Sequence, residues 1–95
     1  MADDLIPVFP EIAAKALINA DWYQSLYDKS INDPVGFWGE QATKTLHWFK
    51  AFSKVKSGGF DGDARVKWFE DGRINACYNC IDRHLPQRMN QTAII

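Results

Sequence analysis

Residues 66–85 read VKWFEDGRINACYNCIDRHL, and this stretch decides the fold that we expect for the chain. Residues 66–69 alternate between two faces, which is the pattern of a half-buried strand. Asp71-Gly72 follows at once and favours a type I′ turn, because both residues tolerate positive φ. The sequence therefore predicts a hairpin over residues 66–74, in which Arg73 and Ile74 pair back on residues 69–70.

A helix is expected after this hairpin, over residues 75–85. Asn75 can cap its start by accepting hydrogen bonds from free backbone N–H groups. An apolar stripe then follows at helical spacing, formed by Ile74, Tyr78, Ile81 and Leu85. Pro86 interrupts the pattern, so the helix ends at Leu85 or continues beyond it with a kink.

The residues before the hairpin predict three short helices. Pro10 can open a helix that runs to Leu17. Asn19 or Asp21 can cap a second helix over residues 21–28, and Asp33-Pro34 is a strong start for a third that reaches about Leu46. Residues 46–55 give no clear prediction, and residues 57–63 read as a surface loop around Phe60.

The last four residues, Thr92 to Ile95, read as a buried strand that has no turn or polar cap behind it. The expected fold class is α+β: short helices, then a β-hairpin, a helix and a truncated strand. A two-stranded hairpin is marginal by itself. The pattern is therefore that of an N-terminal piece of a larger domain.

The chain has more aromatic residues than a small fold can enclose. Four Trp, three Tyr and six Phe occur among 95 residues. At roughly 200 Å² each they represent about 2,600 Å² of surface that prefers to be dry. We therefore expect an aromatic patch that is left for a partner, or for sequence beyond Ile95.

Charge and cysteine usage limit the partners and the compartment. The net charge of −1 gives no general attraction for nucleic acid, and no apolar run is long enough for a membrane span. Asp3 and Asp4 stand where a signal peptide would be basic. Two cysteines without a secretory signal indicate the cytoplasm, with free thiols.

Lysines alternate with aromatic residues in one segment, as they do in proteins that bind single-stranded nucleic acid. The segment holds Lys44, Lys50, Lys54 and Lys56 with Trp48, Phe49 and Phe52. It has no arginine, and acidic residues lie close to it in the sequence. We therefore favour buried rings and solvated lysines over a nucleic-acid site.

Cys77 and Cys80 form a C-x-x-C pattern at the start of the expected helix. Such a pair can carry redox chemistry, or it can bind zinc if His84 joins it, with Asp82 or His47 as a further ligand. No βαβ unit surrounds the pair, and no second Cys/His pair accompanies it. We favour packing of two small residues over both alternatives.

The remaining candidate residues have structural interpretations that we prefer. On a helix, the side chains of Asp82, Arg83 and His84 point in different directions and cannot converge on one substrate atom. A salt bridge and a histidine that is hydrogen-bonded to the backbone are therefore expected.

The spacing of Asp61 and Asp63 is that of the first ligands in a calcium-binding loop. Arg65 and Val66 occupy the next ligand and glycine positions of such a loop, so we reject that site. No phosphate loop or nucleophile motif occurs. We therefore assign no catalytic, cofactor-binding or metal residue.

Taken together, the residues resemble one family. They are Tyr23 and Tyr27, SINDP (30–34), FWGEQA (37–42), Trp48, Val55-Lys56, Phe60, KWFEDG (67–72), Ile74-Asn75, NCIDRHL (79–85) and TAII (92–95). In this order and spacing, the chain from Tyr23 onward is similar to the N-terminal region of AMP-forming acetyl-CoA synthetases. Pro86 and Cys77 depart from the family's pattern.

This resemblance implies a much longer protein of the adenylate-forming superfamily. Such enzymes adenylate acetate with Mg-ATP and then transfer the acetyl group from acetyl-AMP to coenzyme A. The implied division is an extension over residues 1–20, the family's N-terminal segment over 21–91, and the first strand of an AMP-binding domain over 92–95. The partner implied is the remainder of the same polypeptide. The alternatives are a stand-alone interaction module and a redox or metal element at Cys77 and Cys80.

Overall fold

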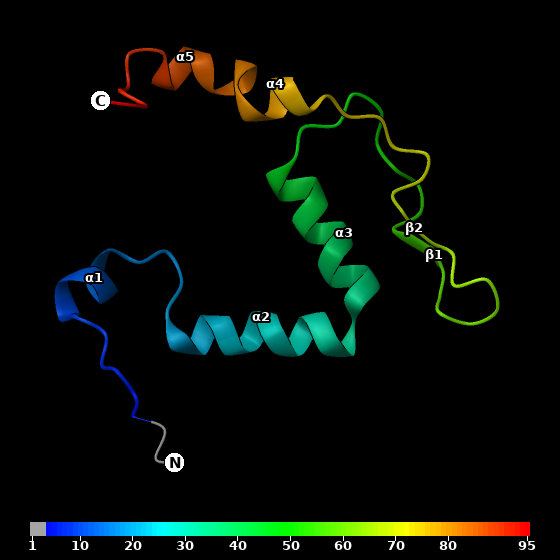
Figure 1. Cartoon of the computed structure of the whole chain (residues 1–95), viewed down its shortest axis with the longest axis horizontal. Coiled ribbons are helices and arrows are strands. Elements are labelled where there is room, and N and C mark those ends of the chain that lie inside the picture. The colour runs from blue at the N-terminus through cyan, green and yellow to red at the C-terminus, as the bar shows by residue number, and fades with distance from the viewer. Residues whose placement is uncertain (1–3) are drawn as a thin grey trace. The chain divides into compact units, whose positions relative to one another are not determined.

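The computed structural model describes residues 4–95 (Figure 1). Helices come first in the chain, one small sheet follows them, and further short helices come after the sheet. The described residues divide into two compact units, one that ends at Pro34 and one that spans Val35–Ile95. The mixture of helices with a two-stranded antiparallel sheet agrees with the expected α+β class. Asp3, which entered the signal-peptide argument, lies outside the described residues.

The first unit contains the helices α1 (Pro10–Lys15) and α2 (Ala20–Asn32). Proline opens α1 as predicted, although α1 ends two residues before Leu17. The side chain of Asn19 caps α2 by accepting a hydrogen bond from the backbone N–H of Trp22, at 2.8 Å. The predicted cap is thus confirmed, and α2 extends four residues beyond the expected end at residue 28.

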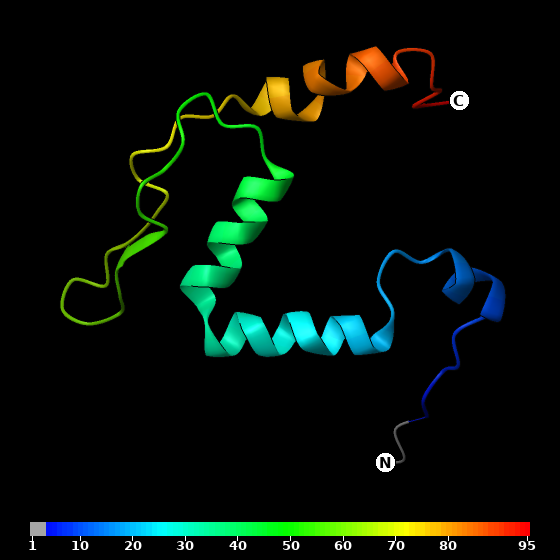
Figure 2. The same cartoon turned by 180° about the vertical axis from the view of Figure 1, so that it is seen from behind.

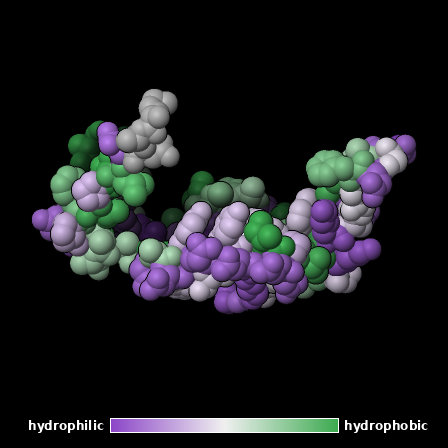
Figure 3. Space-filling model, turned by 90° about the horizontal axis from the view of Figure 1, so that it is seen from below, coloured by the Kyte–Doolittle hydropathy of each residue, from purple (hydrophilic) through white to green (hydrophobic). Residues whose placement is uncertain are grey.

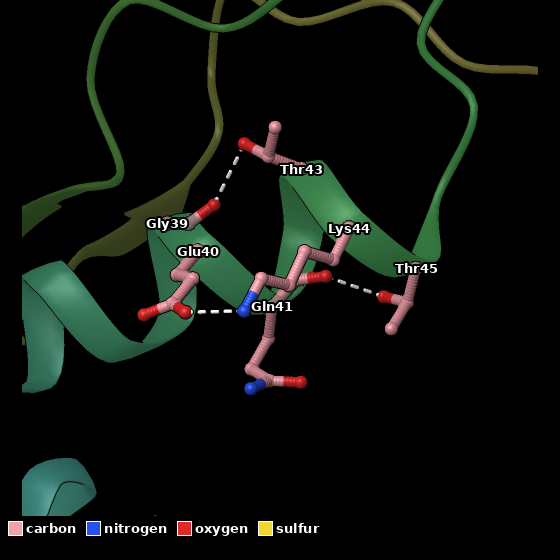
Figure 4. A network of polar contacts seen from close by, with 6 residues as sticks. All are labelled: Gly39, Glu40, Gln41, Thr43, Lys44 and Thr45. Atoms are coloured by element: carbon pink, nitrogen blue, oxygen red, sulfur yellow. Dashed lines mark hydrogen bonds and ion pairs between the residues drawn. The ribbon is translucent and has the colours of Figure 1, made fainter.

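Helix α3 (Pro34–Thr45) begins at the expected proline and ends one residue before the predicted limit. Several of its polar side chains bond within the helix (Figure 4). The hydroxyl of Thr43 donates to the carbonyl of Gly39 at 2.8 Å, and Lys44 forms an ion pair with Glu40 one turn earlier. The apolar residues of this helix are therefore free to pack on the segments that follow it.

The sheet pairs β1 (Lys56–Gly58) with β2 (Val66–Trp68), antiparallel, with Lys56 opposite Trp68 and Gly58 opposite Val66. The strand at residues 66–68 was predicted, but its partner was not. The predicted hairpin over residues 66–74 is wrong, because the strand pairs with residues that precede it. The predicted loop around Phe60 is the connection of the observed hairpin.

The backbone at Phe69 explains why the predicted pairing fails. Phe69 has a φ of +50°, so the chain leaves the extended conformation one residue after β2. Its N–H donates to the carbonyl of Val55, and its carbonyl accepts from Gly72 across a tight turn. Arg73 then pairs with Lys50 in an isolated bridge. The tight turn spans residues 69–72 with Glu70 and Asp71 at its centre, and neither Asp71 nor Gly72 has positive φ, so the predicted type I′ turn is wrong as well. This turn returns the chain to residues 50–55 rather than to residues 69–70.

The predicted helix over residues 75–85 is divided into three pieces. These are α4 (Ala76–Cys80), a 3-10 turn η1 (Asp82–His84) and α5 (Leu85–Arg88), which follow one another in Figure 2. Asn75 caps α4 as predicted, accepting from the N–H of Tyr78 at 2.9 Å. A continuous helix would drive the ring of Pro86 into the carbonyl of Asp82. The break at Ile81 avoids that clash, since it places Pro86 in the first turn of α5.

Residues 92–95 are not a buried strand in this structure. They have no strand partner, and Ile94 and Ile95 are exposed. A strand forms only where a neighbouring strand accepts its backbone hydrogen bonds. The hydrophobic pattern alone does not supply that neighbour.

The side chain of Asn79 joins α4 to the segment that follows α3. Its Oδ1 accepts from the N–H of His47 at 2.7 Å, and its Nδ2 donates to the carbonyls of His47 and Asn75 at 2.9 and 3.0 Å. Asn79 is only 6% exposed. One buried amide therefore satisfies both backbone groups of His47, 32 residues earlier in the chain.

Substitution of Asn79 by Ala is expected to lower the free energy of unfolding by about 1–3 kcal/mol, because it leaves backbone groups of His47 unpaired. Chemical denaturation monitored by circular dichroism measures this change. Asn90→Ala, at an exposed turn position, is the matched control and should change stability by less than about 0.5 kcal/mol. Equal stability of the two variants would contradict the role given to Asn79.

Two adjacent glycines provide a second test. At Gly58 (φ +75°) an added Cβ would lie 1.9 Å from the carbonyl oxygen of Arg65, whereas at Gly59 it would meet nothing within 4 Å. Gly58→Ala should therefore separate β1 from β2 and cost more than about 1 kcal/mol, whereas Gly59→Ala should not destabilise the chain. Amide hydrogen exchange of residues 56–58 and 66–68 measures the difference. Unchanged protection in Gly58→Ala would show the register to be wrong.

Candidate functional site

The most prominent feature of the surface is exposed apolar area. Within residues 4–95 the buried residues are Ala42 and Asn79, although 46% of the chain is hydrophobic. Figure 3 shows hydrophobic residues lying at the surface among hydrophilic ones. Aromatic side chains therefore remain exposed, as expected, among a larger number of exposed apolar residues.

Six rings of the second unit form a connected group that we call the ring cluster. Its members are Phe37, Trp38, Trp48, Phe52, Trp68 and Phe69, with centroid distances of 4.6–6.4 Å between neighbours. The indole N–H of Trp48 donates to the carbonyl of Ala42 at 2.9 Å. The same indole lies against Gly72, where an added Cβ would be 2.5 Å from its Cζ3. These contacts fix the ring of Trp48 between α3 and the turn after β2.

A smaller aromatic group lies beside the Asn79 amide. The ring of Tyr78 is 4.8 Å from that of His47 and 5.4 Å from that of Phe49. Phe49 is nevertheless 60% exposed. The expectation that the rings of residues 48–52 are buried is therefore only partly met, since Trp48 and Phe52 are half-buried.

Three rings of the cluster line an apolar hollow of about 220 Å³ that is open to solvent and that we call the ring hollow. It is lined by Trp38 of α3, Trp68 of β2 and Phe69. Trp38 and Trp68 are 46% and 44% exposed, so both still present ring surface to solvent. The ammonium group of Lys56 lies 5.4 Å from the centre of the Trp68 ring, within the range of a cation–π contact.

The cysteines do not occupy the environment that packing predicts, since Cys77 and Cys80 are both exposed and free. Our packing interpretation is therefore wrong for these residues. Cys80 and His84 line one open hollow of about 310 Å³, together with Arg88, Gln91, Thr92 and Ala93. Neither Cys77, Asp82 nor His47 lines it. Within the described range 4–95, no three His, Cys, Asp or Glu residues are grouped closely enough to hold a metal ion.

Arg83 and His84 contact each other rather than a common target. The Nε of Arg83 donates to Nε2 of His84 at 3.3 Å, and its Nη1 donates to the carbonyl of Thr45 at 2.9 Å. The histidine thus accepts from a neighbouring side chain, where a backbone bond was expected. Because Thr45 is the last residue of α3, the guanidinium also neutralises the negative end of that helix. The contacts of this pair are structural.

The side-chain carboxylate of Asp71 binds both the backbone and the hydroxyl of Ser53. The N–H of Ser53 donates to Oδ1 and Oδ2 of Asp71 at 2.9 and 3.1 Å, and the hydroxyl of Ser53 donates to Oδ2. These hydrogen bonds hold the pKa of Asp71 below its ordinary value, and the bond from the Ser53 hydroxyl has the largest effect. Asp71 therefore connects the turn after β2 to the loop before β1.

Sequence reasoning missed two parts of this arrangement. Asn79 has no signal in the expected helix, since at 100° per residue it lies off the face of the apolar stripe, and its burial depends on the distant His47. The ring hollow has no signal either, because Trp38 of α3 lies about 30 residues before Trp68 and Phe69. The arrangement can bind another apolar surface. No helix among the described residues is both long and apolar enough to cross a bilayer.

The described residues thus define a class of chain: a mixed helix-and-sheet segment in which many aromatic and aliphatic side chains are exposed. The profile described as "Acetyl-coenzyme A synthetase N-terminus" matches residues 23–80, and the chain belongs to this family. It is 50% identical over 95 residues to the acetyl-coenzyme A synthetase of Syntrophus aciditrophicus and 48% identical to that of Syntrophobacter fumaroxidans. The enzyme of Marinobacter nauticus is 51% identical over 90 residues.

These matches extend over nearly the whole of this chain. They cover 100% of it for the first two relatives and 94% for the third. The chain spans 14% of the length of each of these curated relatives. The resemblance found from the motifs alone is thereby confirmed.

The link between Asp71 and Ser53 predicts a dependence on acid. Because the folded pKa of Asp71 is lowered, its contribution to stability is present above the unfolded value of about 3.9 and is lost as the pH falls through the folded value. Ser53→Ala keeps the carboxylate but removes the hydroxyl donor, so the pKa of Asp71 should rise toward its ordinary value. Titration of the Asp71 carboxyl carbon by NMR measures both values. Identical pKa values in the two proteins would contradict the assignment.

Proposed function

We propose that this chain is the N-terminal segment of an AMP-forming acetate–CoA ligase. The enzyme would adenylate acetate with Mg-ATP and transfer the acetyl group of acetyl-AMP to coenzyme A in the cytoplasm. The observation that carries this proposal is the match of residues 23–80 to the family, with acetyl-coenzyme A synthetases about half identical over the whole chain. ATP, Mg²⁺ and coenzyme A would bind elsewhere in that enzyme.

We assign the segment itself a structural role. Its partner is the remainder of the same polypeptide, an AMP-binding domain that would cover the exposed apolar surface of the segment. Residues 92–95 would become the first strand of that domain. Two observations support this role. The chain corresponds to 14% of the length of its relatives, and Ala42 is the buried hydrophobic residue among residues 4–95. Exposed apolar surface of this kind favours contact with another part of a protein, because burial removes it from water.

The alternative of a stand-alone interaction module has less support, because each relative named above is a longer enzyme. The redox or metal alternative at Cys77 and Cys80 rests on the sequence spacing, and the structure places only Cys80 and His84 in one hollow. The ligase segment therefore remains the function that the observations support best.

The test of this proposal is an assay of the protein encoded by the whole gene. We expect formation of AMP and acetyl-CoA that requires acetate, ATP and coenzyme A together, and omission of each compound in turn is the control. The polypeptide of residues 1–95 alone should bind neither ATP nor coenzyme A in calorimetry. A stop codon directly after Ile95, no acetate-dependent AMP formation, or tight ATP binding by residues 1–95 would each contradict the proposal.

A further inference from the structure

The ring hollow is the part of the exposed surface best suited to hold one group of a partner. Its lining is entirely aromatic, from Trp38, Trp68 and Phe69. The hollow is open to solvent, and its volume of about 220 Å³ leaves room for one bulky side chain. Because its walls offer no polar atom, the water against them bonds only to other water and is readily displaced by an apolar group.

The walls of the hollow are held in place by contacts that do not involve a partner. The ring of Phe69 packs on Phe52 at 4.6 Å and on Trp48 at 5.5 Å, and its N–H donates to Val55 at 2.8 Å. Trp68 meets Trp38 edge-on at 6.4 Å. Because the rings are already ordered, little conformational entropy is lost when a group enters the hollow.

The backbone of Phe69 is a second and independent observation. Its φ of +50° is uncommon for a bulky residue, and such strain persists where the surrounding structure requires it. The strained conformation turns the chain directly after β2, so that consecutive residues Trp68 and Phe69 both line the hollow. Strain that creates an exposed apolar hollow is typical of a binding position.

One charged group lies beside a wall of the hollow, since the ammonium group of Lys56 is 5.4 Å from the centre of the Trp68 ring. Tryptophan is enriched at the points of an interface that contribute most to binding.

We propose that the ring hollow receives one apolar side chain, aromatic or branched aliphatic, from the large domain of the same polypeptide, and that this contact anchors the N-terminal segment. The inference rests on the proposed function, because the occupant is taken from the sequence that the longer relatives possess. A group on the same polypeptide is present at high effective concentration, which a second copy of the chain is not.

The experiment uses the protein encoded by the whole gene, labelled with 5-fluorotryptophan and observed by ¹⁹F NMR. Trp68→Phe and Trp38→Phe assign the two resonances and retain an aromatic ring in the hollow. Exposed indoles shift when H₂O is replaced by D₂O, and the same protein in urea gives the value for full exposure. We expect the native shifts of Trp38 and Trp68 to be several-fold smaller than in urea and unchanged on dilution.

The outcomes separate this inference from the proposed function. A full solvent shift at Trp68 in a protein that makes acetyl-CoA would overturn the inference and leave the function standing. Shielding that is lost on dilution would identify a second copy as the occupant and would also overturn it. Concentration-independent shielding in a protein without acetate-dependent AMP formation would support the anchor and contradict the function.

Discussion

The buried amide of Asn79 is the interaction on which the second unit depends. It binds both backbone groups of His47 and the carbonyl of Asn75, so it joins two segments that are 32 residues apart. Apolar contacts could bring these segments together in several registers, whereas an amide with three fixed partners allows one. With His47 fixed, Trp48 lies beneath α3 and Phe49 lies against Tyr78.

The positions of the rings follow from that fixed point. Trp48 contacts Phe52 and Phe69, and the close approach of its indole to Gly72 places the turn after β2. The carboxylate of Asp71 then binds Ser53, and Arg73 pairs with Lys50. A few polar contacts thus position a group of rings that is only half-buried. Hydrophobic burial supplies less of the order here than in an ordinary small domain, where large side chains fill the interior.

This balance fits a segment whose apolar surface is completed by another part of the protein. The acetyl-coenzyme A synthetases that it resembles are about seven times as long, to judge from the 14% that the chain covers. A surface that docks permanently benefits from rings that are ordered beforehand, since their ordering then costs nothing on docking. The ring hollow is the clearest instance, because three rings and a strained Phe69 form it without a partner.

The sequence by itself determined the local features: Asn19 and Asn75 as helix caps, Pro10 and Pro34 as helix starts, the strand at residues 66–68, the surplus of rings and the family. Each depends on neighbours within a few residues, or on motif order. Only the tertiary structure decided that β2 pairs with β1, that Cys77 and Cys80 are exposed, and that residues 92–95 lack a strand partner. Those outcomes depend on which distant segment supplies the hydrogen bond or the covering surface, and no local pattern contains that information.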